Sequence, residues 1–149
     1  MKKEIIDYLE NIKKIVGDQL TNQELISFSD TDKFPNYGGV YFIYDKDDEL
    51  VYIGAGLNIK KRCMQYVSKG DGATFRFNLI QIKELPDTKI SEIKSNKEIN
   101  DKWIKKIKEE YKAKFIKVDG LEKDIAYEEN VYIVAFKPIC NKFSLSTKK

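Results

Sequence analysis

The sequence predicts an α+β fold, a small three-stranded sheet that contains an antiparallel hairpin and is flanked by helices. The first observation is a pair of short segments, 40–44 and 50–53, that are rich in β-branched and aromatic residues. The second is segment 112–118, in which apolar and polar residues alternate with the period of a strand. The third is that apolar residues recur at helical spacing before and after these segments. A chain of 149 residues can form one domain with a substantial core.

The residues before the hairpin are expected to be mainly helical. Apolar residues in segment 5–16 repeat at helical spacing with charged residues between them, and Gly17 is expected to end this helix. Residues 22–28 are a candidate for a second short helix. Segment 29–38 is polar and contains a proline, which is typical of a loop. Residues 1–36 are therefore interpreted as an N-terminal helical extension.

The two strand segments are joined by a run of charged residues, 45–49, which favours a hairpin. Glycines stand at both ends of this hairpin, at 38–39 and within 54–56. Because glycine has no Cβ, the backbone can turn sharply there, or lie close to a ligand.

A helix with a basic face is expected directly after the hairpin. Asn58 is the expected N-cap, since an asparagine side chain can accept a hydrogen bond from the first helical turn. Ile59, Cys63 and Tyr66 recur at helical spacing and form the apolar face. The opposite face carries three cations close to the glycine turn: Lys60, Lys61 and Arg62.

The rest of the chain is interpreted as helices with one strand among them. Segment 75–85 alternates loosely enough to be helix or strand, and we favour a helix capped by Thr74. Residues 87–96 are polar and are expected to be an exposed connection. The residues at 144–149 are expected to be a disordered tail. Between them we expect a helix, the third strand and a largely apolar helix, at 98–111, 112–118 and 122–136.

The charge, the cysteines and the absence of long apolar runs limit which partners and locations the sequence favours. The chain has 27 Lys and Arg against 24 Asp and Glu, so its surface is highly charged with only a mild basic excess, and a DNA footprint must be local. Cys63 and Cys140 lack metal-ligand spacing and are interpreted as reduced, buried thiols. No signal peptide or long apolar run is present, so no membrane association is expected and a cytoplasmic location is the default.

Five sequence elements together carry a resemblance to a known family. Gly39-Val40-Tyr41 and Tyr52-Ile53-Gly54 resemble the two tripeptides of the GIY-YIG nucleases. Arg62 matches the family's arginine on the next helix, Glu129 its metal-binding glutamate and Asn141 its later asparagine. Two tripeptides alone are weak evidence, but five elements in the right order are fairly specific.

The resemblance implies a metal-dependent endonuclease that hydrolyses DNA phosphodiester bonds, with its catalytic domain at 37–143. It implies that Tyr41 is the general base, that Tyr52 positions the water or the phosphate, and that Arg62 contacts the scissile phosphate. Glu129 would hold Mg²⁺ or Mn²⁺; Mg²⁺ in particular needs few protein oxygens and keeps several waters. The chain contains no histidine, so histidine cannot be the base.

Ala55 departs from the pattern of some family members, which have a lysine directly after YIG. Lys60, Lys61 and Arg76 are alternative sources of the missing cation, and the sequence does not decide among them. A Gly-Asp-Gly loop at 70–72 is a secondary candidate for a DNA contact. The full set of expected substrate-binding residues is Gly54, Lys60, Lys61, Arg76 and Asn141.

Each of these residues also has a purely structural interpretation. A strand tyrosine usually packs with its hydroxyl at the surface, and a basic helix face is ordinarily solvated. Glu129 stands on a largely apolar helix and can be a salt-bridge partner rather than a metal ligand. Only the joint order of the five elements favours a function.

Two rival hypotheses remain. The first is a catalytically silent nucleic-acid-binding module that retains the nuclease fold, for which Ala55 is the best argument. The second is a structural or interaction protein whose motifs are coincidental packing. If the chain is a nuclease, its specificity would come from the N-terminal extension and the middle of the chain, from a homodimer or from a separate targeting partner. The biological setting, whether restriction or defence, mobile-element spread or repair, stays open.

Overall fold

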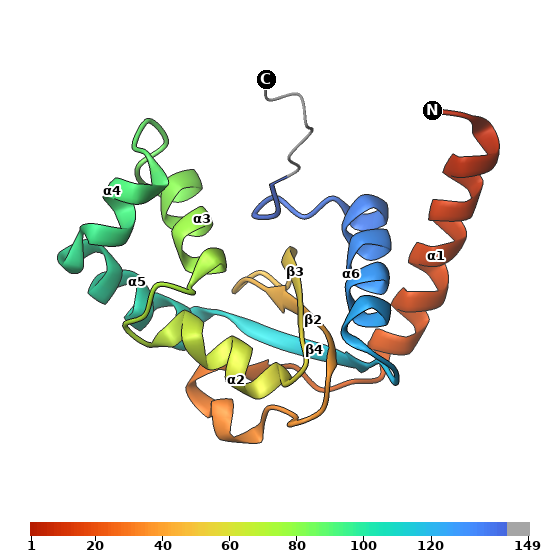
Figure 1. The fold of residues 1–149 in the computed structure, drawn as a ribbon, viewed down its shortest axis with the longest axis horizontal. Coiled ribbons are helices and arrows are strands. Elements are labelled where there is room, and N and C mark those ends of the chain that lie inside the picture. The colour runs from red at the N-terminus through yellow and green to blue at the C-terminus, as the bar shows by residue number, and fades with distance from the viewer. Residues whose placement is uncertain (143–149) are drawn as a thin grey trace.

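A four-stranded antiparallel sheet with strand order β1-β4-β2-β3 forms the centre of the fold (Figure 1). The computed structural model describes residues 1–142, so the tail expected at 144–149 lies outside the described residues. The α+β class is confirmed, but the sheet has one strand more than the three that the sequence predicts. The strands are β1 (Ile26–Ser27), β2 (Gly39–Tyr44), β3 (Leu50–Gly56) and β4 (Lys112–Lys117).

The additional strand is β1, which pairs with β4 through Ile26 opposite Ala113 and Ser27 opposite Lys112. The prediction of a short helix at 22–28 is wrong here. A strand of two residues is too short to show alternation in the sequence, so only its pairing with β4 defines it. The chain then enters a 3-10 helix, η1 (Phe28–Lys33), whose first side chain is buried.

Helices cover both faces of the sheet (Figure 1). None of the helices in residues 1–142 is long and apolar enough to cross a membrane. One face is covered by α1 (Lys3–Thr21) and α6 (Glu122–Phe136). The other face is covered by α2 (Ile59–Met64), η2 (Gln65–Val67), α3 (Thr74–Lys83), α4 (Ile90–Ser95) and α5 (Lys97–Glu110).

The central strand β2 is buried on both sides, and its side chains divide between two cores. Tyr41 and Ile43 pack into the core beneath α2 to α5, whereas Val40 and Phe42 pack into the core beneath α1 and α6. This division follows from the pleat, because successive side chains of a strand point to opposite faces. Tyr41 therefore lies on the face of the sheet that α2 covers.

Helix α1 is longer than the sequence predicts, since it continues through Gly17 to Thr21. A glycine inside a helix costs about 1 kcal/mol relative to alanine. Leu20 lies beyond the glycine and is only 4% exposed. Burial of a leucine stabilises by about 1.5–3 kcal/mol, which offsets the cost of the glycine.

The expectation of an exposed connection at 87–96 is also wrong in part. Residues Ile90–Ser95 form α4, and Ile93 is fully buried against the neighbouring helices. A single buried apolar side chain among polar ones does not produce a helical period, so the sequence pattern does not reveal the short helix α4. Helix α3 is confirmed, but it begins at Thr74 itself, with Ala73 as the residue before its first turn.

Candidate active site

Three tyrosines from different elements form a cluster beneath α2. Tyr41 comes from β2, Tyr52 from β3 and Tyr66 from η2. The hydroxyl oxygens of Tyr41 and Tyr66 lie 2.5 Å apart and are hydrogen-bonded. The ring centroids of Tyr41 and Tyr52 lie 6.5 Å apart, and those of Tyr52 and Tyr66 lie 6.1 Å apart. The two motif tyrosines therefore belong to one packed group.

Tyr66 is a member of this cluster that the sequence interpretation assigns only to the apolar helix face. It stands four residues after Arg62, so both side chains lie on the same side of a helical segment. The Arg62 guanidinium carbon lies 5.1 Å from the centre of the Tyr66 ring. This i,i+4 relation to the motif arginine is the signal in the sequence that identifies Tyr66.

The cluster is largely shielded from water. Tyr41 is 1% exposed, Tyr66 is fully buried and Tyr52 is 7% exposed. Burial raises the pKa of Tyr41 and of Tyr66 well above the ordinary value of 10. Burial also raises the pKa of Tyr52, and the positive charge of Arg62 opposes that shift. A phenolate in this cluster therefore needs a cation beside it.

Arg62 is held in a defined position above the tyrosines. The Asn58 side chain caps α2 as expected, accepting a hydrogen bond from the Lys61 backbone N–H at 3.0 Å. The Arg62 guanidinium then donates to the Gly72 carbonyl oxygen at 2.5 Å and to the Gln65 side chain. Its side chain is only partly buried, so remaining N–H groups can reach a bound anion.

Glu129 approaches from the other helical layer. Because β3 is the edge strand, α6 and α2 can both reach past its end. Glu129 lines a pocket of about 130 Å³ with Ala55 and Leu57 at the end of β3 and with Ile125 of α6. No hydrogen bond or ion pair joins the Glu129 carboxylate to any residue in the part of the chain that the structure describes. The carboxylate is thus available to a ligand.

The charges around Glu129 connect it with the tyrosine cluster. Burial raises the pKa of Glu129 above its ordinary value of 4.5, and the positive charge of Arg62 opposes the shift. Glu129 in turn contributes to the raised pKa of Tyr52. The four residues expected to be catalytic, Tyr41, Tyr52, Arg62 and Glu129, are therefore brought together in one region from four elements.

The donor set at this place fits a hard divalent cation. Residues 1–142 contain no group of three or more His, Cys, Asp or Glu side chains suited to hold a metal ion. Mg²⁺ is commonly bound through one or two carboxylates, with waters and substrate oxygens completing its coordination. A single carboxylate without a protein partner, beside a pocket, meets this requirement. Glu129 is the residue that would hold the ion.

Asn141 was expected to bind substrate, but its side chain is occupied within the fold. Its amide oxygen accepts from the Ile53 backbone N–H, and its amide nitrogen donates to the Ile53 carbonyl oxygen, both at 2.8 Å. These two bonds satisfy the Ile53 backbone on the outer edge of β3, with which no further strand among residues 1–142 pairs. Asn141 therefore holds the strand that carries Tyr52, and its contact with substrate stays a prediction.

Gly54, which is also expected to bind substrate, is buried inside the sheet. It lies opposite Tyr41 in the pairing of β2 with β3. A Cβ atom at Gly54 would come within 2.3 Å of the Tyr41 ring. The glycine of the second tripeptide is thus required by the tyrosine of the first, and even alanine would displace that ring.

The candidates for the cation missing at Ala55 have different surroundings. Lys60 donates from its ammonium group to the Asp32 carbonyl oxygen at 3.0 Å, so it is held against η1. Lys61 is exposed on α2. Arg76 is only 2% exposed, and its guanidinium bonds to Asn100 and to backbone carbonyl oxygens. Which of the three replaces that lysine stays a prediction, and Lys61 is the most accessible of them.

Two comparisons with known proteins bear on this site. The GIY-YIG catalytic domain matches residues 37–142. The chain is also 45% identical over 40 residues to the bifunctional monothiol glutaredoxin-S16, chloroplastic, of Arabidopsis thaliana. That match covers 27% of this chain and 14% of the glutaredoxin, so the chain spans about a seventh of the length of this relative.

The family match includes both tripeptides, the α2 arginine, the α6 glutamate and the asparagine that pairs with β3. It extends over most of the chain. The chain therefore belongs to the GIY-YIG catalytic-domain family, a family of nucleases.

Proposed function

We propose that this protein is an endonuclease that hydrolyses DNA phosphodiester bonds with a divalent cation, Mg²⁺ or Mn²⁺, as cofactor. The observation that carries the proposal is that Glu129, whose carboxylate has no partner among residues 1–142, lies beside the end of the edge strand and within the electrostatic influence of Arg62, which in turn lies over the tyrosine cluster. A carboxylate, a guanidinium and a hydroxyl are the groups that phosphodiester hydrolysis requires.

In the proposed reaction a water molecule attacks phosphorus, and the bond from phosphorus to the 3′ oxygen breaks. The Arg62 guanidinium donates hydrogen bonds to the non-bridging oxygens, whose negative charge grows in the transition state. Glu129 would hold the cation, which would supply Lewis-acid stabilisation to the departing oxygen. Tyr41 is the proposed base, and Tyr52, as the most exposed member of the cluster, positions the water or the phosphate.

We also propose that residues 37–143 form the catalytic unit and residues 1–36 an extension that serves specificity. Val16 and Leu20 of α1 share one core with Ile125 and Tyr132 of α6, the helix that carries Glu129. The extension is thus packed against the catalytic helix. A homodimer or a separate targeting partner remains the alternative source of specificity, in restriction or defence, mobile-element spread or repair.

A silent nucleic-acid-binding module is the second candidate, and Ala55 is the observation that favours it. Ala55 lines the pocket beside Glu129, at the position where some family members have a lysine. Such a module would bind DNA in a salt-dependent manner but would not cleave it.

Cleavage of supercoiled plasmid with Mg²⁺, with Mn²⁺ and with a chelator tests the proposal. We expect nicked or linear product only when a divalent cation is present. The ratio of nicked to linear product shows whether one strand or both are cut. Absence of cleavage with either cation, across plasmids of different sequence and with DNA binding measured in parallel, would favour the silent module.

Tyr41→Phe should lower the cleavage rate by ~10²–10⁴-fold while DNA binding stays close to that of the parent, because only the hydroxyl of the proposed base is lost. Since burial raises the pKa of Tyr41, the parent's rate should rise with pH across the neutral and alkaline range. Single-turnover cleavage at several pH values measures both effects.

Tyr44→Phe is the matched control, because Tyr44 stands on the same strand but outside the tyrosine cluster. It should cleave like the parent. Tyr41→Phe also leaves the Tyr66 hydroxyl without its partner, which costs about 1–3 kcal/mol of stability. A Tyr41→Phe protein that is less stable but cleaves at the parent's rate would assign Tyr41 to packing and place the base elsewhere.

A further inference from the structure

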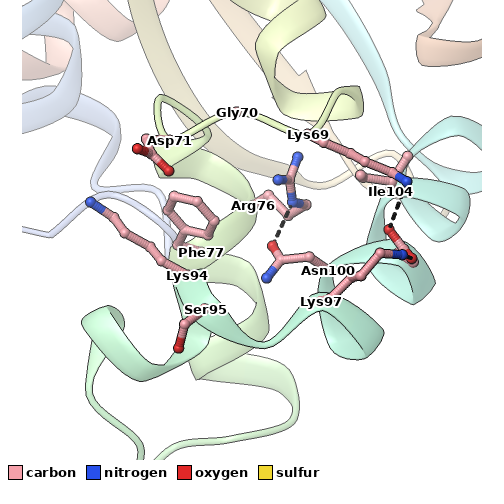
Figure 2. Close-up of a pocket in the computed structure, with 11 residues that line it drawn as sticks. Lys69, Gly70, Asp71, Arg76, Phe77, Lys94, Ser95, Lys97, Asn100 and Ile104 are labelled. Atoms are coloured by element: carbon pink, nitrogen blue, oxygen red, sulfur yellow. Dashed lines mark hydrogen bonds and ion pairs between the residues drawn. The ribbon is translucent and has the colours of Figure 1, made fainter.

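A second pocket, of about 170 Å³, lies between the loop at 69–71, α3, the end of α4 and the first half of α5 (Figure 2). It shares no lining residue with the pocket at Glu129. It is large enough for several water molecules, and hence for a phosphate group. Its lining includes four cationic and two acidic side chains: Lys69, Arg76, Lys94, Lys97, Asp71 and Asp101.

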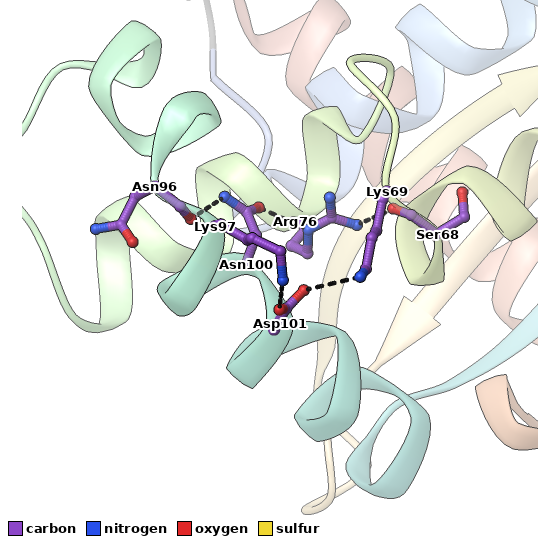
Figure 3. Close-up of polar contacts among 7 residues, drawn as sticks. All are labelled: Ser68, Lys69, Arg76, Asn96, Lys97, Asn100 and Asp101. Carbon is purple, nitrogen blue, oxygen red and sulfur yellow. Dashed lines mark hydrogen bonds and ion pairs between the residues drawn. The ribbon is translucent and has the colours of Figure 1, made fainter.

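Arg76 is the buried cation at the centre of this pocket (Figure 2). Its Nε donates to the Asn100 side-chain oxygen at 2.9 Å, and its Nη1 donates to the Ser68 carbonyl oxygen at 3.0 Å (Figure 3). Nη1 also donates to the Tyr66 carbonyl oxygen at 2.7 Å. All of these acceptors are neutral. Asp101 lies close enough for its negative charge to favour the charged guanidinium, but in the described part of the chain no carboxylate is hydrogen-bonded to Arg76. A buried charge without a bonded counter-ion is energetically costly.

The second terminal nitrogen of Arg76, Nη2, has no hydrogen-bond partner among residues 1–142. Among the same residues, no fully buried side-chain nitrogen or oxygen lacks a partner. It follows that Nη2 retains access to solvent, through the pocket that Arg76 lines. A guanidinium has five N–H donors in a fixed plane, and those on Nη2 can serve a ligand in the pocket.

The lysines around Arg76 add positive charge at the rim. Lys97 and Lys69 both approach Asp101, with nitrogen-to-oxygen distances of 2.7 and 3.9 Å (Figure 3). The Lys94 ammonium lies 5.6 Å from the centre of the Phe77 ring and is exposed. Burial lowers the pKa of Arg76 to about 10, so the guanidinium still carries its charge at neutral pH. Positive charge exceeds negative charge in the pocket, which favours an anion.

Gln65 connects this pocket with the candidate active site. Its side-chain oxygen accepts from Arg62, and its backbone carbonyl oxygen accepts from Arg76 at 3.4 Å. The two arginines thus contact the same residue, one at its side chain and the other at its backbone. A DNA strand carries a phosphate every ~3.4 Å along the helix axis, so a strand bound at Arg62 brings neighbouring phosphates to the region of Arg76.

We propose that the pocket around Arg76 is a second phosphate subsite, which binds a backbone phosphate of the DNA strand close to the phosphate that is cleaved. The inference rests on the proposed function, since it takes DNA as the ligand. Arg76 is therefore assigned a contact with DNA inside its own pocket, which Ala55 does not line. This role differs from that of the lysine that some family members have at the position of Ala55.

Lys94→Ala tests the subsite without removing a structural contact of the core. We expect the affinity for a fluorescently labelled duplex, measured by anisotropy in the presence of a chelator, to fall by ~3–10-fold. The slope of log affinity against log salt should decrease by about 1, because one phosphate contact is lost. Asp71→Asn should raise the affinity for the duplex, since it removes a negative charge from the same pocket.

Lys105→Ala is the matched control, an exposed lysine of α5 that does not line the pocket. It should change the affinity by less than about twofold. Equal effects of Lys94→Ala and Lys105→Ala on affinity and on the salt slope would overturn the proposal. The isotope-labelled parent protein is also titrated with inorganic phosphate, and the amide NMR shifts of Gly70 and Ser95 are followed. This titration distinguishes a DNA phosphate from free phosphate as the ligand of the pocket.

Shifts of these amides by inorganic phosphate, combined with DNA affinity that does not depend on Lys94, would mean that the pocket takes a free anion and would reject the DNA assignment. DNA affinity that depends on Lys94 in a protein that does not cleave DNA would support the subsite and count against the nuclease function. The two proposals can thus fail separately.

Discussion

Glu129→Gln is expected to abolish divalent-cation-dependent cleavage, with a loss of ~10³-fold or more. Glutamine keeps the size of the side chain but cannot offer a charged oxygen to the cation, which is worth several kcal/mol in the transition state. Since burial raises the pKa of Glu129, cation binding by the parent should weaken as the pH falls towards that raised pKa. Plasmid cleavage and cation titration of both proteins measure these effects.

Glu128→Gln is a close control, because Glu128 stands next to Glu129 but its carboxylate accepts a hydrogen bond from the Tyr132 hydroxyl at 2.6 Å. Glutamine can accept the same bond, so this variant should retain cleavage. If Glu128→Gln loses cleavage and Glu129→Gln keeps it, the assignment of the metal ligand is wrong.

Stability provides an independent readout for Glu129. A carboxyl whose pKa is raised on folding binds its proton more tightly in the folded protein, so the ionised form costs folding free energy above that pKa. Glu129→Gln should therefore have a melting temperature at neutral pH equal to or above that of the parent. The difference should shrink as the pH falls through the raised pKa towards 4.5. A large loss of stability would instead indicate a structural ion pair.

Arg62→Ala should reduce the single-turnover cleavage rate by ~10²–10³-fold, the loss typical of removing one preorganised donor to a developing negative charge. The guanidinium is already fixed by the Gly72 carbonyl oxygen and the Gln65 side chain, so it needs little reorganisation when substrate binds. Arg62→Lys should recover only a small part of the rate, because an ammonium cannot bond simultaneously to these groups and to a phosphate in a planar fork.

Lys61→Ala distinguishes catalysis from general attraction to DNA. Lys61 adjoins Arg62 on α2 and is exposed. Its loss should therefore weaken DNA binding without a large change in the rate at which bound DNA is cleaved. Equal losses of rate in Lys61→Ala and Arg62→Ala would assign Arg62 to general electrostatic attraction. Thermal unfolding of Arg62→Ala is measured alongside, because its bond to Gly72 also restrains the loop at 65–73.

Local sequence features found the hairpin and the helix that follows it because each signal there is short-range. The pairing of β2 with β3 is antiparallel as expected, and Asn58 is the N-cap of α2. Cys63 and Cys140 are free and buried, also as expected. The sequence missed β1 and α4, whose few residues gain their stability from contacts with distant segments rather than from their own pattern.

Arg76 and Asn141 show why side-chain roles are harder to predict than elements. The sequence predicts that Asn141 contacts substrate and offers Arg76 as one source of the cation missing at Ala55, but it does not reveal the partners of either side chain. In the folded chain Asn141 pairs with the backbone of Ile53, and Arg76 bonds to carbonyl oxygens at the end of η2. No pattern within either segment specifies partners that lie many residues away.

The sequence by itself determined the α+β class, the hairpin with its two tripeptides, and the order of tyrosine, arginine and glutamate, since these depend on residues close together in the chain or on motif order. Only the tertiary structure decided that Glu129 lies beside the end of β3 in the opposite helical layer from Arg62, that Tyr66 joins Tyr41, and that Arg76 lies buried in a second pocket. The physical reason is that strand order, burial and hydrogen-bond partners are fixed by packing between distant segments, whereas propensity and periodicity act only within a few turns of the backbone.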